Sequence, residues 1–428
     1  MDRDRRAVVS WWLYDWANSA FILTVGAGFF PIFFKSYWCA SVDATVSTAR
    51  LGMGNAAAGL IVAVLSPLLG AVADVGRLKK GLLTFFVCTG AFTTIVLFFM
   101  PQDEWLGALA VFLIASVGFN SANIFYDALL VDITSKEKMD WVSSVGYGIG
   151  YLGCGLLFLL NVLMVSFPSF FGLPGKATAV RVSFIMAAGW WLLFSVPIVL
   201  FVHERKGRST RNIVPLLKES MQGLFRTAKT ILRNRTLLFF LLAYWLYIDG
   251  LHTFVLMAID FGMAIDIPQG ALMVALIVVQ FIGFPCTLLM GKLATRFSAL
   301  TIIVADLLIY IAVCGVGALM VRDAVSFIVL AGFTGVAQGG IQALSRSYFG
   351  KIIPPESAAE YFGFYNVVSR FAVIFGPAFV GMVALFTRMA GVPSKVASRL
   401  GMSSVSLLFI VGAILLFAAD KLKKENCG

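Results

Sequence analysis

The chain has 428 residues, of which 60% are hydrophobic and only 13% are charged. Soluble domains are about 45–50% apolar and about 25% charged, so the composition excludes an ordinary soluble protein and indicates a membrane protein. Two histidines and six scattered cysteines without metal-ligand spacing favour neither a metal site nor a disulfide framework. We therefore expect no metal and no cofactor.

Apolar blocks of about 20 residues recur along the whole chain, and an α-helix of that length crosses about 30 Å of hydrocarbon. The blocks are continuously apolar rather than alternating, which favours helices over a β-barrel. The predicted fold class is an all-α membrane protein with twelve transmembrane helices. The predicted spans are residues 10–38, 51–73, 81–100, 105–133, 141–167, 180–202, 236–264, 268–290, 298–320, 325–350, 361–387 and 397–418.

Lysine and arginine are unevenly distributed between the segments that join these spans. With a cytoplasmic N-terminus, the inner segments hold 23 of these residues and the outer segments hold seven. The positive-inside rule therefore predicts that both termini lie in the cytoplasm. This topology accounts for the net charge of +11, and no nucleic acid partner is expected. The first span is too long for a cleaved signal peptide, so we expect it to stay in the protein.

The two halves of the chain echo each other in sequence. Trp-Leu-Tyr-Asp at residues 12–15 returns at residues 245–249 with one residue inserted, and Asp-Trp at residues 140–141 is matched by Glu-Tyr at residues 360–361. Repeated halves with a site between them build many secondary transporters. The predicted organisation is two pseudo-symmetric six-helix halves, at residues 1–202 and 236–428, joined by a basic cytoplasmic linker at residues 203–235.

The segment after the second span carries a further pattern. Residues 70–80, GAVADVGRLKK, resemble the signature cytoplasmic loop of the major facilitator superfamily, with one residue fewer between the aspartate and the glycine-arginine pair. The corresponding stretch of the second half, residues 291–295, has Thr295 in place of the aspartate. The resemblance implies the twelve-helix major facilitator fold and a gating role for Asp74 and Arg77.

Three longer stretches resemble one branch of this superfamily. They are WWLYDWANSAF at residues 11–21, YWLYIDGLHT at residues 244–253 and GGIQALSRSYFGKIIPPESAAEYFGFYNV at residues 339–367. The branch contains autophagy-related vacuolar effluxers and their bacterial relatives, and the resemblance runs over nearly the whole chain. It implies a secondary transporter, and the fungal relatives are associated with amino acid efflux from the vacuole. No autophagy role is implied for this chain.

Polar residues in the first span form one stripe. An ionisable side chain near the centre of a span costs about 2.5–3.5 kcal/mol, so it indicates a cavity or a polar partner. Trp11, Asp15 and Asn18 recur at helical spacing. They are predicted to share a face that continues to Ile22. Asp15 is a candidate proton or cation carrier or part of the inner gate, and a structural hydrogen bond to the terminus of a neighbouring helix is the alternative.

The fourth and tenth spans carry two further stripes. Asn123 and Asp127 lie one helical turn apart in the fourth span. Near the end of that span, Asp132 is predicted to form a gate salt bridge with the basic loop at Arg77. The stripe of the tenth span is costly in lipid and is therefore predicted to line a cavity. Its candidate residues are Gln338, Gln342 and Arg346.

The seventh and eleventh spans supply the remaining candidates. Asp249, near the membrane midplane, is a candidate ligand for a substrate ammonium group or a proton carrier. Tyr247 and His252 lie close to it in sequence, and His252 is either a proton relay or a structural histidine. In the eleventh span, Asn366 and Arg370 share a face. Arg370 is predicted either to neutralise an aspartate or to bind a substrate carboxylate.

Three other features of the spans bear on function. Residues 146–155 contain G-x-G-x-x-G, but they lie in an apolar span, so they predict a close-packing surface rather than a nucleotide site. Gly376 and Pro377 predict a kink where a gate flexes. Asp306 lies in the ninth span, which usually faces lipid in the superfamily, and no role is predicted for it.

Together these features predict a secondary active transporter that works by alternating access, is coupled to protons or another ion, and moves a small zwitterion such as an amino acid. An amphiphile such as a lysolipid or a drug-like compound is the alternative substrate. A non-transporting receptor or scaffold is the alternative from another class. No nucleophile-base constellation indicates an enzyme. We expect a monomer in a bacterial inner membrane, with a small-molecule substrate and membrane lipid as partners.

Overall fold

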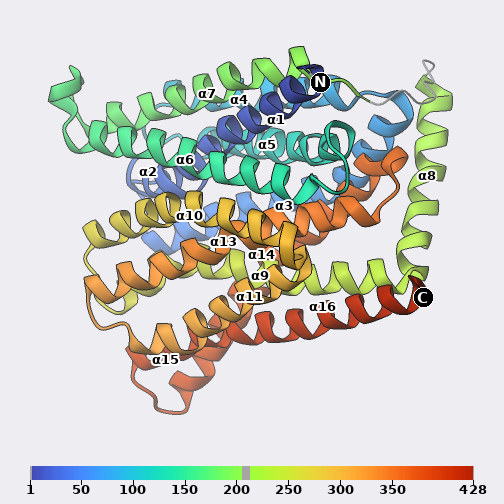
Figure 1. The fold of residues 1–428 in the computed structure, drawn as a ribbon. Coiled ribbons are helices and arrows are strands. Elements are labelled where there is room, and N and C mark those ends of the chain that lie inside the picture. The colour runs from blue at the N-terminus through green and yellow to red at the C-terminus, as the bar shows by residue number, and fades with distance from the viewer. Residues whose placement is uncertain (1, 205–212, 428) are drawn as a thin grey trace. The chain divides into compact units, whose positions relative to one another are not determined.

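A computed structural model of the chain describes residues 2–204 and 213–427. Within its helices, the description leaves out the side chains of residues 2–3, 44–45, 213–218, 269, 370–374 and 423–427. The described residues form helices joined by loops, and they contain no β-strand (Figure 1). The predicted all-α fold class is confirmed.

The predicted membrane spans correspond to helices along the whole chain. Among the described residues, eleven helical stretches are long and apolar enough to cross a membrane, and each overlaps one predicted span. The predicted span at residues 361–387 corresponds to helix α14 (Ala358–Met389), which has 32 residues. A helix of about 20 residues crosses the hydrocarbon core, so α14 is long enough to span it. Each of the twelve predicted spans therefore has its helix.

The chain divides into two compact units. Unit 1 consists of Met1–Thr134, Ile149–Met221 and Pro354–Gly363, and unit 2 consists of Ser135–Gly148, Gln222–Ile353 and Phe364–Gly428. Each unit thus contains a short segment from the other half of the sequence, residues 354–363 in unit 1 and residues 135–148 in unit 2. The division into six-helix halves at residues 202 and 236 stays a prediction.

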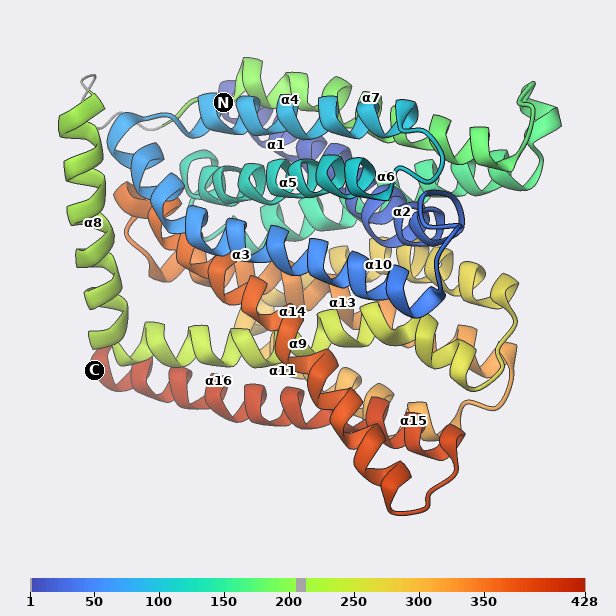
Figure 2. The ribbon, with the colours of Figure 1, turned by 180° about the vertical axis from the view of Figure 1, so that it is seen from behind.

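Unit 1 is built on a row of packed helices. Its helices are α1 (Asp2–Ala20), α2 (Phe30–Phe33), α3 (Ala44–Gly76), α4 (Lys79–Val96), α5 (Trp105–Ile133) and α7 (Lys176–Phe201), with the short η3 (Leu97–Phe99), η4 (Pro168–Phe171) and η6 (Pro355–Ser357) and most of α6 (Met139–Ser166). α7 packs on α1 and α4, and α5 packs on α4 and α3 (Figure 2). A Cβ at Gly118 would lie 2.8 Å from the Gly90 Cα atom. Small residues therefore bring α4 and α5 together, as is common between membrane helices.

The first span is not a uniform α-helix. After α1 it continues through two π-helical segments, η1 (Phe21–Phe29) and η2 (Phe34–Trp38), with α2 between them. Trp11, Asp15 and Asn18 are buried, but Ile22 is 48% exposed. The buried part of the predicted face therefore ends at Asn18, and Ile22 lies in η1. The reason is that a π-turn spaces its hydrogen bonds five residues apart and shifts the side chains out of the α-helical phase.

Unit 2 is a second set of packed helices. They are α9 (Arg235–Ala264), α10 (Gln269–Phe297), α11 (Ala299–Ala312), η5 (Val313–Gly317), α12 (Ala318–Met320), α13 (Ala324–Ile352), α15 (Ser394–Ser404), α16 (Ser406–Cys427) and most of α14. α13 packs on α10 and α11, and α16 packs on α11 and α9. α13 starts with a capping box, in which the Asp323 carboxylate accepts the Ser326 N–H at 2.9 Å. This bond and the Ser326 hydroxyl hold the pKa of Asp323 below its usual range.

The predicted basic linker contains helix α8 (Ile213–Arg233). Its described side chains include the apolar Phe225 and Leu232, which are 70% and 68% exposed. The basic residues Arg226, Lys229 and Arg233 lie between or beside them. Asn234 separates α8 from α9 and caps α9, because its side chain accepts the Leu237 N–H at 3.2 Å. The linker is therefore largely an amphipathic helix.

Two glycines of α6 allow it to approach α1 within unit 1. A Cβ at Gly153 would lie 2.6 Å from the Trp16 ring, and a Cβ at Gly150 would lie 2.8 Å from the Ser19 hydroxyl. The predicted close-packing surface at residues 146–155 is confirmed at these two positions.

We expect Gly153→Ala to lower the melting temperature of the purified protein in detergent, because overpacking a close contact costs about 1–3 kcal/mol. Gly189→Ala on α7 is the matched control, since no atom lies within 4 Å of the added Cβ. There alanine replaces glycine without a clash, and its higher helix propensity of about 1 kcal/mol keeps or raises the melting temperature. Equal melting temperatures for the two variants would contradict this account.

Candidate functional site

A buried carboxylate, Asp15 of α1, is the centre of a polar cluster in unit 1. Its Oδ2 atom accepts a hydrogen bond from the Tyr126 hydroxyl of α5 at 2.7 Å. The Trp11 indole stacks on the Tyr126 ring, with centroids 4.4 Å apart, and donates its Nε1–H to the Tyr126 carbonyl oxygen at 2.9 Å. The structure thus gives Asp15 a hydrogen bond to a neighbouring helix, but from a side chain within α5 rather than from a helix terminus. A transport role for Asp15 stays a prediction.

The polar stripes of the first and fourth spans meet in the same cluster. The Asn18 Nδ2 atom donates to Asn123 Oδ1 at 2.6 Å, and the Ser19 hydroxyl donates to Asn18 Oδ1 at 3.4 Å. Asp127, one turn beyond Asn123 on α5, is 8% exposed. Asp15, Asn18 and Asn123 thus meet where α1 contacts α5, and Asp127 is buried one turn further along α5.

A lysine joins two carboxylates at the ends of α3 and α5. The Lys79 Nζ atom lies 3.2 Å from Asp74 Oδ1 and 3.2 Å from Asp132 Oδ2, and the three side chains are at most 7% exposed. The sequence predicts that Asp132 pairs with the loop at Arg77, and the structure gives Lys79 of that loop as its partner. Arg77 ends α3 with a φ of 54°, and its N–H donates to the Ala73 carbonyl oxygen.

The end of α3 also holds the start of α14 within unit 1. The Asp74 Oδ2 atom accepts the Glu360 N–H at 2.8 Å. A carboxylate at a helix N-terminus is stabilised by the helix dipole. Gly70 permits this approach, because a Cβ there would overlap the Ala359 carbonyl oxygen. Asp74, a predicted gating residue, therefore binds both a lysine and a helix N-terminus.

Asp249 of α9 is a fully buried carboxylate in unit 2. Its Oδ1 atom accepts the Gly376 N–H at 3.0 Å and the Thr253 hydroxyl at 3.4 Å. Its Oδ2 atom is buried and has no hydrogen-bond partner among the described residues. Pro377, next to Gly376, cannot donate a backbone hydrogen bond within α14. The Oδ2 atom of Asp249 therefore has no partner among the described residues, and it lies beside a turn of α14 that lacks the N–H of residue 377.

The other candidates of unit 2 lie at separate places. The Tyr247 hydroxyl is 2.7 Å from the Ser345 hydroxyl, and the Gln338 Oε1 atom accepts from the Tyr310 hydroxyl at 3.4 Å. The remaining candidates with described side chains are the partly exposed His252 and Gln342 and the buried Asn366. The side chain of Arg370 lies outside the described residues.

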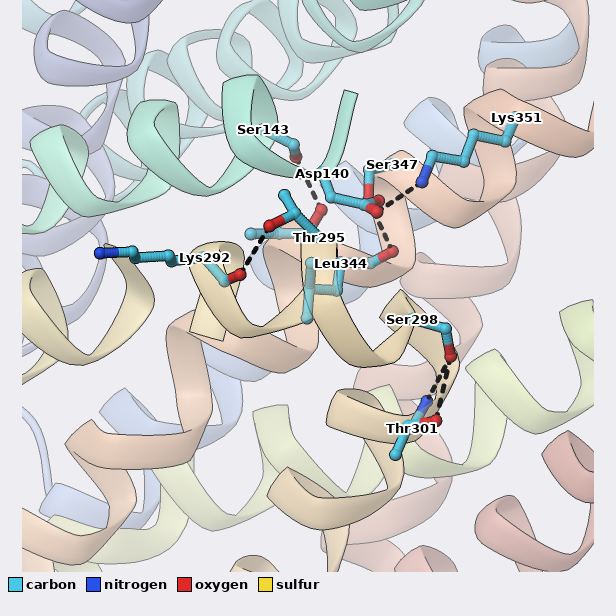
Figure 3. A network of polar contacts seen from close by, with 10 residues as sticks. Asp140, Ser143, Lys292, Thr295, Ser298, Thr301, Leu344, Ser347 and Lys351 are labelled. Carbon is cyan, nitrogen blue, oxygen red and sulfur yellow. Dashed lines mark hydrogen bonds and ion pairs between the residues drawn. The ribbon is translucent and has the colours of Figure 1, made fainter. Parts of the chain in front are cut away.

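A polar network binds the start of α6 inside unit 2 (Figure 3). The Asp140 carboxylate accepts from the Ser347 hydroxyl at 2.7 Å and from the Lys351 ammonium at 2.5 Å. Nearly one turn further along α6, the Ser143 hydroxyl donates to the Ala343 carbonyl oxygen at 2.6 Å. Figure 3 shows the Asp140 carboxylate turned toward both Ser347 and Lys351. These hydrogen bonds thus join the start of α6 to α13.

Arg346 of α13 belongs to the same contact. Its Nε and Nη2 atoms donate to the Ser143 hydroxyl at 3.0 Å and to the Ser143 carbonyl oxygen at 3.1 Å, and its guanidinium lies 4.2 Å from the centre of the Tyr147 ring. Gly291 of α10 gives room for α6, because a Cβ there would overlap the Ser144 side chain. Arg346 thus binds α6 in this structure, and a role in substrate binding stays a prediction.

Several residues of these clusters lie outside the predicted set of site residues. Among them are Lys79, Tyr126, Asp140, Ser143, Ser347 and Lys351. Asp140 has a signal in the sequence, because it belongs to the repeat that pairs residues 140–141 with residues 360–361. Tyr126 and Lys351 have no such signal, since their carboxylate partners are 111 and 211 positions away in the chain. Only the folded structure brings them together.

Comparison with known proteins places the chain in a family. Residues 41–426 match the family described as "Vacuole effluxer Atg22 like". The MFS-type transporter YxiO of Bacillus subtilis is 38% identical over 418 residues, which cover 97% of this chain and 95% of that protein. Autophagy-related protein 22-1 of Neosartorya fischeri is 26% identical over 289 residues, which cover 62% of this chain and 47% of that protein. The match thus spans about half the length of that fungal relative.

Solved structures share the fold. The human organic anion transporter MFSD10 has a TM-score of 0.73 at 14% identity, over 96% of this chain and 99% of that one. The major facilitator superfamily transporter FucP, in the outward conformation, has a TM-score of 0.68 at 13% identity, over 96% of this chain and 98% of that one. At these identities the likeness shows the fold, which is that of major facilitator transporters.

The chain is therefore a multi-pass membrane protein of the transporter class, with the major facilitator fold. It belongs to the family of Atg22-like vacuole effluxers. The predicted family and fold are confirmed. The relatives and structural neighbours are transporters rather than enzymes.

We expect Tyr126→Phe to lower the melting temperature, because it removes the hydrogen bond to Asp15 and leaves the ring stack in place. A hydrogen bond to a charged group contributes about 1.5–3 kcal/mol. Tyr37→Phe is the control, since the Tyr37 ring stacks on Phe33 and its hydroxyl has no hydrogen bond among the described residues. The same loss of melting temperature in both variants would argue against a stabilising bond to Asp15.

We expect Asp140→Asn and Lys351→Met to be coupled in a double-mutant cycle. The pair is partly buried, with side-chain exposures of 5% and 24%, so its coupling energy should exceed the ~0.2–1 kcal/mol that is typical of exposed pairs. Chemical unfolding of the wild type, the two single variants and the double variant measures it. The exposed pair Asp266 and Lys395 gives the reference cycle, and strictly additive effects at Asp140 and Lys351 would refute the coupling.

Proposed function

We propose that this transporter is a secondary active carrier that works by alternating access, is coupled to protons and moves a small zwitterionic solute such as an amino acid. One chain is the proposed working unit. The distribution of lysine and arginine supports cytoplasmic termini. The similarity to a Bacillus subtilis transporter supports a place in a bacterial inner membrane.

Asp249 is the residue that most supports proton coupling. An unpaired charge inside a membrane protein is costly, and one oxygen of this carboxylate has no partner among the described residues. That oxygen can take up a proton or bind a substrate ammonium group. A carrier that exchanges protons for solute needs such a group, because the same side chain must be neutral in one step and charged in another.

The polar contacts at the starts of α6 and α14 support alternating access. Asp140 and Arg346 take part in holding the start of α6 in unit 2, and Asp74 holds the start of α14 in unit 1. Water can replace the partners in these bonds, whereas the apolar packing elsewhere in each unit has no such substitute. We therefore assign these contacts to the cytoplasmic gate, which breaks when the carrier opens inward.

The substrate class follows from charge. An amino acid carries an ammonium group, which a carboxylate such as Asp249 can bind, and a carboxylate, which suits the bidentate donors of an arginine such as Arg370. The family description names effluxers, which supports export of the solute rather than import.

A thermal-shift screen tests the substrate class. A ligand at about 100 times its Kd stabilises the folded state by about 2.7 kcal/mol, so a transported amino acid should raise the melting temperature of the purified protein. Lysolipids and drug-like cations form the second panel. A shift with that panel alone would replace the amino acid by an amphiphile, and no saturable shift or flux with either panel would favour a receptor or scaffold.

For the mechanism, we expect Asp249→Asn to abolish solute accumulation driven by a pH gradient in proteoliposomes while solute exchange without a gradient continues. The physical reason is that asparagine cannot change its charge. Asp260→Asn on the same helix removes an exposed carboxylate and should leave both activities unchanged. Gradient-driven accumulation that survives in Asp249→Asn would exclude Asp249 as the coupling residue.

A further inference from the structure

Asp306 of α11 is a buried carboxylate that the proposed transport mechanism does not use. The sequence places it in a span that usually faces lipid in the superfamily and predicts no role for it, and in the structure Asp306 is 0% exposed. Its α11 helix packs against α13, α16 and α10. The residue therefore points into protein rather than lipid.

The surroundings of the Asp306 carboxylate are apolar and close. A Cβ at Gly340 of α13 would overlap its Oδ2 atom, and the same Cβ would lie 3.0 Å from the Met290 side chain of α10. Neither carboxylate oxygen has a hydrogen-bond partner among the described residues. Gly340 has no side chain, and this leaves room for the Asp306 carboxyl group.

No cation pairs with Asp306 in the part of the chain that the structure describes. On α13, Arg346 binds Ser143 and Lys351 binds Asp140. The titratable group that interacts with Asp306 is the Cys286 thiol of α10, which carries no positive charge. The elements packed on α11 carry further ionisable or thiol groups, and none of those described forms a salt bridge with Asp306. These groups are Lys292, Arg296, Cys314, Tyr348, Asp420 and Lys421. α9 touches α11 through Phe254, and its Asp249 is bonded to Gly376.

We propose that Asp306 carries a proton and is a second proton-binding site, separate from Asp249. An ionised carboxylate here would be a buried charge without a donor or a cation among the described residues, and the penalty for such a charge is several kcal/mol. The neutral acid fits the site as it stands. Its proton can leave only when water or a cation reaches the carboxyl group, which requires α11 to separate from Gly340 of α13.

Infrared spectroscopy of the purified protein at neutral pH tests this directly, because a protonated carboxyl group has a C=O stretching band that a carboxylate lacks. We expect the wild type to show the band, and Asp306→Asn to lose intensity in it. Asp260→Asn, which removes an exposed carboxylate from α9, should keep the full band. An unchanged band in Asp306→Asn overturns the proposal.

A second variant covers the case in which Asp306→Asn does not fold. Protein with ¹³C-labelled aspartate shifts the aspartate band away from that of glutamate, and Asp306→Glu then removes Asp306 from the shifted band while keeping a carboxyl group. Loss of shifted intensity supports the proposal, and its full retention refutes it. The outcome does not depend on transport, so it remains separate from the outcome for Asp249→Asn.

Discussion

The removal of charge from water is the constraint on which the rest of this structure depends. The spans are long enough to cross a membrane, and an ionised side chain within them is stable only beside a partner. Lys79 meets that constraint by lying between Asp74 and Asp132. Asp15 meets it with the Tyr126 hydroxyl. Most of the polar contacts that join distant parts of the sequence stabilise a charged side chain that has been removed from water.

Asp249 and Asp306 meet the constraint incompletely, and they differ in kind. Among the described residues, Asp249 has donors on one oxygen and none on the other. In the same part of the chain, Asp306 has no donor on either oxygen. A partly satisfied carboxylate can change its protonation state at moderate cost, whereas one without donors is stable only when neutral. Both lie beside a glycine of a neighbouring helix, Gly376 or Gly340, so helix movement changes the surroundings of each.

The two units hold a helix start in similar ways, but the carboxylate comes from a different side of the contact in each. In each unit a glycine, Gly70 or Gly291, lets the start of a helix from the other half of the sequence come close. In unit 1 the carboxylate is Asp74 in the last turn of α3, and the helix start supplies an N–H. In unit 2 the corresponding residue near the end of α10 is Thr295, and the carboxylate is Asp140 on the helix start, paired with Lys351. The sequence difference at Thr295 therefore has a structural counterpart.

The sequence by itself determined the spans, the helical class and the family, because span length, continuous apolarity and long motifs are properties of neighbouring residues. It also found Asp15, Asn18 and Asp249 as polar residues in apolar helices. Only the tertiary structure decided their partners, since Tyr126 is 111 positions from Asp15 and Lys351 is 211 from Asp140. The same holds for Ile22 and Asp306. A local turn type and the packing of neighbouring helices set their exposure, and neither leaves a pattern along the chain.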